Sequence, residues 1–100
     1  MATLHTIIKV FAVRGRHFNI VKNEEGFYLA IEDKYITNGK INTTLNGFEM
    51  NADKNLDSCL KGCKNKVDLE YYISQGYSKA EAFAKTFDIP MSSEVEKLFA

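Results

Sequence analysis

One hundred residues are enough for one small domain, which we predict to span residues 1–100. Thirteen Lys and Arg balance thirteen Asp and Glu, and this zero formal net charge argues against a protein that coats nucleic acid or an anionic membrane. Apolar residues make up 45% of the chain, which excludes wholesale disorder, and no apolar run approaches the roughly 20 residues of a membrane span.

The first third of the chain has the composition of β-strands. Apolar and β-branched residues predict three strands, at about residues 4–13, 17–22 and 27–32. Gly15 and Gly26 lie in the short polar turns that separate them, and the second turn reads as a four-residue hairpin loop. We therefore predict an antiparallel sheet of three strands, or more, over about residues 3–36.

The next stretch, about residues 37–52, is predicted to be an irregular connection. It contains Asn38-Gly39 and Asn46-Gly47, two dipeptides that suit type I′ turns. The first dipeptide can join Tyr35–Thr37 to Lys40–Asn42 as a small hairpin. An irregular path with one short ribbon is an equal alternative, because the two turns leave room only for very short strands.

Helical periodicity begins near Asp53, which we expect to cap the first helix. Gly62 weakens the end of this helix, and a second short helix follows over about residues 67–75. Ser78 opens a third helix with a capping box, and the spacing from Ser93 to Glu96 predicts the cap of a last one. The predicted fold is therefore α+β, in which three to four short helices over about residues 53–99 pack on the sheet.

Two cysteines, Cys59 and Cys63, lie four residues apart on one face of the first predicted helix. We interpret them as thiols in a reducing compartment and therefore expect a cytoplasmic protein with no cofactor, since no secretory signal opens the sequence. Together with His5 and His17 they would form a tetrahedral zinc set. A small zinc-binding protein thus remains an alternative, although the histidines are twelve positions apart on separate predicted strands.

Catalytic motifs are missing from the chain. No nucleophile elbow and no phosphate-binding glycine loop occurs, and the paired carboxylates fall in turns or on polar helix faces. We therefore predict that the protein is not an enzyme.

Residues 80–95 resemble a helix-turn-helix, with Ala84 at the position of its small residue and Ile89 at that of its apolar turn residue. The resemblance implies a DNA-binding regulator as an alternative function. Asp88 replaces the usual turn glycine, and Glu94 and Glu96 in the would-be recognition helix repel phosphates. We therefore do not expect nucleic acid as the partner.

Both faces of the predicted sheet carry large apolar residues, whereas one face of an antiparallel sheet is normally polar. Coverage of the second face by the chain's own helices is the commoner outcome. If that face is open, it is a surface for a protein partner or for a homodimer. The candidates on it are Ile7, Phe11, Val21 and Tyr28.

In its size and lack of catalytic motifs the chain is similar to accessory proteins of phages, plasmids and mobile elements, including anti-CRISPR inhibitors. Eleven Lys and eight Asn indicate coding by an AT-rich, Gram-positive genome or its phages. No motif in the chain, neither Asn46-Gly47-Phe48 nor Gly76-Tyr77-Ser78, identifies a family, so the likeness assigns no residue a role. The function expected from the sequence is a non-catalytic protein-binding module, an inhibitor or accessory protein of such an element.

Overall fold

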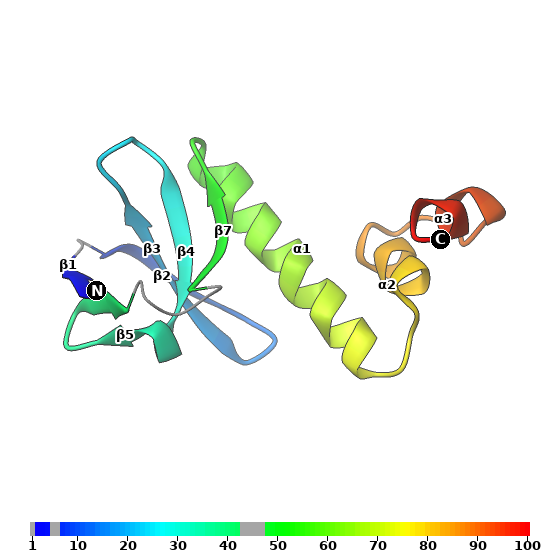
Figure 1. Ribbon diagram of the computed structural model, residues 1–100, viewed down its shortest axis with the longest axis horizontal. Helices are drawn as coiled ribbons and strands as arrows, with labels where there is room; N and C mark the ends of the chain where they lie inside the picture. The colour runs from blue at the N-terminus through cyan, green and yellow to red at the C-terminus, as the bar shows by residue number, and fades with distance from the viewer. Residues whose placement is uncertain (1, 5–6, 43–47) are drawn as a thin grey trace. The chain divides into compact units, whose positions relative to one another are not determined.

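A computed structural model describes residues 2–4, 7–42 and 48–100, and its strands precede its helices (Figure 1). The predicted α+β class with an N-terminal antiparallel sheet is confirmed, and the described part of the chain holds three α-helices. Contacts divide the chain into two compact units, residues 1–63 and 64–100, and the division falls inside the first helix.

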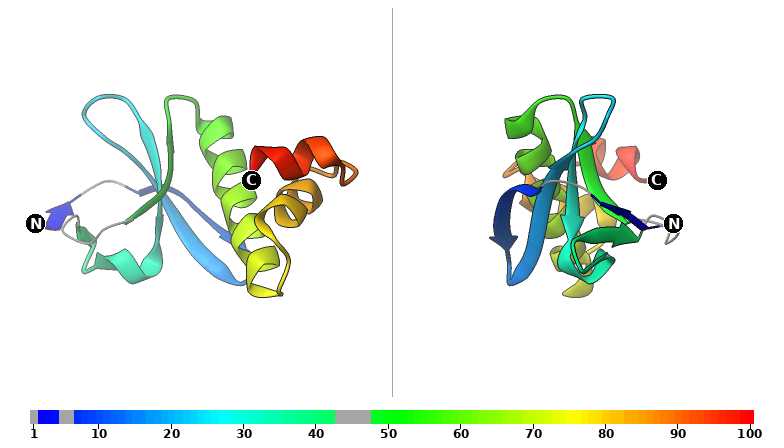
Figure 2. Two further views of the ribbon diagram at one scale, coloured as in Figure 1. Left: turned by 45° about the vertical axis from the view of Figure 1, so that its right-hand side comes forward. Right: turned by 90° about the vertical axis from the view of Figure 1, so that its left-hand side faces the viewer.

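The main sheet has four antiparallel strands in the order β2-β3-β4-β7, so that β2 and β7 are its edges (Figures 1 and 2). Its strands are β2 (Ile7–Val13), β3 (Arg16–Lys22), β4 (Tyr28–Glu32) and β7 (Glu49–Asp53). Arg14 and Gly15 join β2 to β3 with φ values of 50° and 77°, as a type I′ turn requires. The Asn23 side chain holds the loop before β4 by accepting hydrogen bonds from the N–H groups of Glu25 and Phe27. The strands predicted at 17–22 and 27–32 are thus confirmed, while β7 replaces the end of the predicted irregular connection.

A second, smaller sheet has the strand order β1-β6-β5. Its strands are β1 (Ala2–Leu4), β6 (Lys40–Asn42) and β5 (Ile36–Thr37), the last preceded by a 3₁₀ turn at Asp33–Tyr35. The hairpin predicted around Asn38-Gly39 is present, since both residues have positive φ. The prediction of one strand over 4–13 is wrong, because Leu4 pairs with Lys40 whereas Ile7 pairs with Val21. Asn46-Gly47 lies outside the described residues.

Different segments of the chain cover the two faces of the main sheet. On one face Phe18, Ile20 and Ala30 are fully buried, and residues 56–63 of helix α1 (Leu56–Ser74) lie on this face. The other face contributes Val21, Leu29 and Ile31 to a cluster with Ile41, and Phe27, Tyr35, Ile36 and Phe48 pack against it. Over β3 and β4 the second face is therefore covered by residues 35–41 and Phe48, and not by helices as expected, whereas Ile7 and Val10 of β2 remain exposed on it.

Helix α1 is continuous over nineteen residues, where the sequence predicted two helices with a break near Gly62. The Asn51 side chain of β7 occupies the space that a Cβ on Gly62 would need, so a glycine serves close packing at this position rather than helix termination. The cap also differs from the prediction. Asn55 accepts the N–H of Ser58 at 3.0 Å, while Asp53 holds the preceding turn by accepting the N–H of Asn55.

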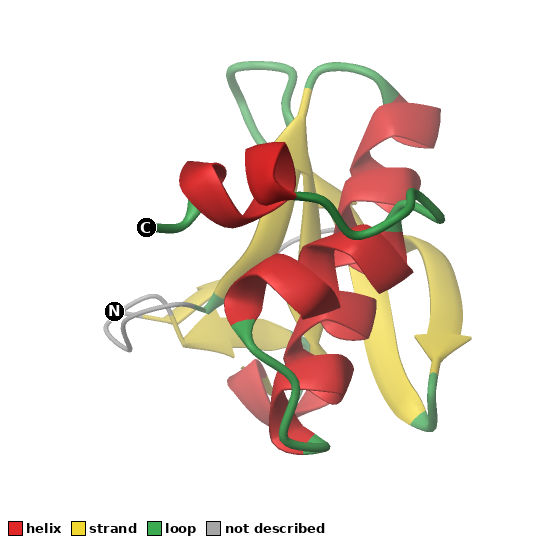
Figure 3. Cartoon of the chain, turned by 90° about the vertical axis from the view of Figure 1, so that its right-hand side faces the viewer, coloured by secondary structure: helices red, strands yellow, loops and turns green. Residues whose placement is uncertain are grey.

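Residues 64–100 end in two short helices, α2 (Lys79–Thr86) and α3 (Ser93–Leu98), joined by an extended loop (Figure 3). The predicted capping box of Ser78 and Glu81 is confirmed, whereas α3 is capped by Ser92 rather than Ser93. The core between the two helices consists of Ala80, Ala84 and Val95 with the ring of Phe83. None of the described helices is long and apolar enough to cross a membrane.

Candidate protein-binding surface

The four predicted partner residues do not share a face of the sheet. Ile7 pairs with Val21 and Lys9 pairs with Ile20, so Ile8 is an extra residue that forms a β-bulge. Side chains alternate along a strand, and the bulge shifts the alternation of β2 by one. Ile7 and Val21 consequently lie on one face, while Phe11 lies on the opposite face.

The degree of burial separates the predicted residues further. Val21 is 1% exposed and belongs to the core, so its assignment to a surface was wrong. Phe11 and Tyr28 are half-buried, and the Phe11 ring stacks on the Phe18 ring with centroids 5.5 Å apart. Of the four predicted residues, Ile7 alone is exposed.

Among the described residues up to Cys63, the exposed large apolar side chains all lie on strand β2. Ile7, Ile8 and Val10 are 43%, 47% and 60% exposed, although each is a β-branched apolar residue. Within the described residues β2 pairs with β3 alone, and it forms an edge of the sheet in the right-hand view of Figure 2. An edge strand presents unpaired backbone groups, and natural proteins usually protect long apolar edges. The sequence identified the strand but not its place in the sheet, because strand order depends on contacts distant in sequence.

The turn after β2 determines which backbone groups point outward. A type I′ turn at Arg14-Gly15 makes Val13 and Arg16 a hydrogen-bonded pair. Hydrogen-bonded and non-hydrogen-bonded pairs alternate along an antiparallel ladder, so the pairs of Val10 with Asn19 and of Ala12 with His17 are not hydrogen-bonded. The N–H and C=O groups of Val10 and Ala12 therefore point away from β3, toward the open side.

The edge strand carries one charge, and an ion pair joins the two strands beside it. Lys9 is the single charged residue of β2. On the neighbouring strands the Arg16 guanidinium donates to both carboxylate oxygens of Glu32, with N···O distances of 3.0 and 2.8 Å. These hydrogen bonds lower the pKa of the Glu32 carboxyl, against the smaller opposing effect of its burial. The edge is consequently apolar with one cation.

Of the four residues of the alternative zinc set, the structure describes Cys59, Cys63 and His17, and it does not bring His17 to the cysteines. Cys59 and Cys63 are fully buried, and the Cys59 thiol donates to the backbone oxygen of Tyr28 at 3.3 Å. His17 is exposed and shares a face of the sheet with Asn19 and Val21, opposite the face on which residues 56–63 of α1 lie. His5 lies outside the described residues. Among residues 2–4, 7–42 and 48–100, no three Cys, His, Asp or Glu side chains form a group that could hold a metal ion.

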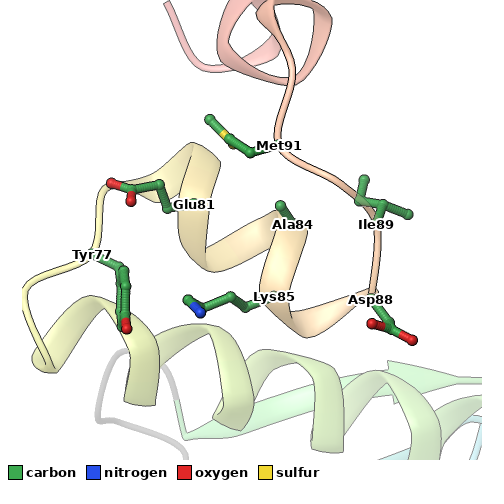
Figure 4. Close-up of a pocket in the computed structure, with 7 residues that line it drawn as sticks. All are labelled: Tyr77, Glu81, Ala84, Lys85, Asp88, Ile89 and Met91. Atoms are coloured by element: carbon green, nitrogen blue, oxygen red, sulfur yellow. The ribbon is translucent and has the colours of Figure 1, made fainter.

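A concave surface lies within residues 64–100, at α2 and the loop that follows it (Figure 4). It has a volume of about 410 Å³ and is lined by Tyr77, Glu81, Ala84, Lys85, Asp88, Ile89 and Met91. The Lys85 ammonium lies 4.7 Å from the centre of the Tyr77 ring, and the Glu81 carboxylate accepts the N–H of Ser78 in the capping box. Glu81 is thus engaged in capping α2, and Lys85 in a contact with the Tyr77 ring.

The helix-turn-helix resemblance is only partly reflected in the geometry. Asp88 has a φ of 52°, the left-handed conformation for which that motif uses glycine. Residues 87–92 separate α2 from α3, however, and this is longer than the three- or four-residue turn of the motif. The short helix α3 also carries Glu94 and Glu96 in its first turn.

Comparison of the sequence with protein-family models gives no match, and comparison with curated proteins and with solved structures gives none either.

Proposed function

We propose that this protein is a non-catalytic protein-binding module that takes up an extended strand of a protein along the outer edge of β2. In this proposal it acts as an accessory protein or inhibitor by presenting that edge. The observation that carries the proposal is the combination of an apolar edge strand with outward-pointing backbone groups at Val10 and Ala12.

Strand addition suits this edge for a physical reason. Main-chain hydrogen bonds to Val10 and Ala12 supply affinity that does not depend on the side chains of the added strand. The exposed side chains of Ile7 and Val10 then select apolar residues at alternate positions of that strand, since successive side chains point to opposite faces. Lys9 favours an acidic residue near one end.

The test is selection of peptides from a displayed random library on immobilised protein at low density, followed by anisotropy titration of the selected peptides. We expect extended peptides with alternating apolar residues. Val10→Pro removes the outward N–H while sparing the ladder with β3, and should abolish binding. Val10→Thr keeps the N–H and the branched shape, and should retain most of the affinity. Equal binding by the wild type and a folded Val10→Pro variant, or a selection without binders, would refute the proposal.

A further inference from the structure

We infer that the strand taken up by β2 is β2 of a second copy of this chain, paired antiparallel about a two-fold axis at Phe11. The inference rests on the proposed function, since it names the occupant of the same edge. In this register Val10 lies opposite Ala12 of the second copy, Lys9 lies opposite Val13, and Phe11 meets its own counterpart.

The outward backbone groups select this register. Centring on Phe11 places Val10 opposite Ala12, and these are the two residues whose N–H and C=O groups are turned outward. Each copy therefore exchanges reciprocal hydrogen bonds at both ends of the pair. The regular segment from Lys9 to Val13 suffices, so the bulge at Ile8 lies outside the paired region. A two-fold centred on Val10 would instead require the irregular residues on the far side of Lys9.

The charges are compatible with self-pairing. Lys9 of each copy faces an apolar residue, and the two lysines lie at opposite ends of the pair. Their Cα atoms are then about 14 Å apart, at about 3.4 Å per residue, which exceeds the Debye length of roughly 10 Å at 0.1 M salt. The whole chain has a formal net charge of zero at pH 7, so two copies do not repel each other at long range.

Apart from Lys9 opposite Val13, the side chains that meet are apolar on both faces of the joined sheet. The half-buried Phe11 already stacks on Phe18, and its counterpart would extend this row of rings on the face that α1 covers. On the other face, the exposed Val10 is covered by Ala12 of the second copy. The pairing thus buries the most exposed β-branched side chain of the strand.

The test combines sedimentation velocity with cross-linking that reports the register. We expect a concentration-dependent dimer for the wild type and for Val10→Thr, and a monomer for Val10→Pro. Phe11→Cys should form an intermolecular disulfide under mild oxidation, because a non-hydrogen-bonded pair brings Cα atoms to about 4.5 Å. Lys9→Cys and Val13→Cys should each fail to cross-link alone, but should cross-link when the two are combined in one chain or when the two single variants are mixed. The native Cys59 and Cys63 are fully buried and do not compete.

The outcomes separate the inference from the proposed function. A wild type that stays monomeric at its highest soluble concentration would overturn the inference, even if library peptides still bind at Val10. Cross-linking of Lys9→Cys alone as efficiently as Phe11→Cys would overturn it as well, since that result implies another register.

Discussion

Replacement of Gly62 by alanine sets two opposite effects against each other in the interior of α1. Alanine is the better helix former by about 1 kcal/mol, so helix propensity alone predicts stabilisation. The packing predicts the reverse. A methyl group on Gly62 would overlap the side-chain amide of Asn51, whose Cγ would be 2.9 Å away. Asn51 must then move, although its Nδ2 donates to the backbone oxygen of Cys59 at 3.2 Å.

The magnitude follows from adding the competing contributions. Loss of a part-buried hydrogen bond costs about 1 kcal/mol. Forcing an extra carbon into a packed contact costs roughly 1–3 kcal/mol. After the gain in helix propensity, we expect Gly62→Ala to lower the free energy of unfolding by about 2 kcal/mol, or about 8–16 °C in Tm at roughly 4–8 °C per kcal/mol.

The assay is urea unfolding followed by circular dichroism, with Lys61→Ala as the matched control at an exposed position of the same helix. In the double variant Asn51→Ala with Gly62→Ala the obstructing amide is absent. This variant should therefore be more stable than the sum of the two single changes allows. A Gly62→Ala protein that is more stable than the wild type, or strict additivity with Asn51→Ala, would refute the packing argument.

Two further predictions concern a helix cap and an ion pair. Ser92→Ala should destabilise α3 by about 1 kcal/mol, because Ser92 Oγ accepts the Val95 N–H at 3.3 Å, whereas Ser93→Ala should change little. Hydrogen exchange at the Val95 amide measures this difference, and equal exchange in the two variants would contradict it. The pairing with Arg16 lowers the pKa of Glu32 in the folded protein. Its contribution to stability is therefore complete at pH values above the ordinary pKa of a glutamate and is lost as the pH falls through the lower folded pKa. Urea unfolding should therefore give the wild type a higher free energy of unfolding than Glu32→Gln at neutral pH, and the difference should shrink as the pH is lowered. A difference in unfolding free energy that does not depend on pH would count against the pairing with Arg16.

Local signals in the sequence predicted the local features well. The capping box at Ser78 and the turn at Asn38-Gly39 each depend on residues within four positions of one another, and both are present. The strands β3 and β4 were predicted from composition for the same reason.

Features that depend on distant contacts were not predictable in this way. Gly62 lies inside the long helix α1, where the Asn51 side chain of β7 leaves no room for a larger residue. Nothing in the periodicity of the helix itself indicates this contact. The bulge at Ile8 reassigned Ile7 to the opposite face from Phe11, although strict alternation placed them together. The candidate edge was missed because the sequence contains no direct record of which strand has a single neighbour.

The peripheral position of β2 has a consequence for how the chain can change over generations. Its outward residues Ile7, Ile8 and Val10 contribute little to the buried core, so substitutions there have a small cost to folding. Under the proposed function, the positions that bind a strand are therefore largely separate from those that hold the fold together. The outer strand can then change in sequence while the cluster around Val21 and Ile31 stays constant.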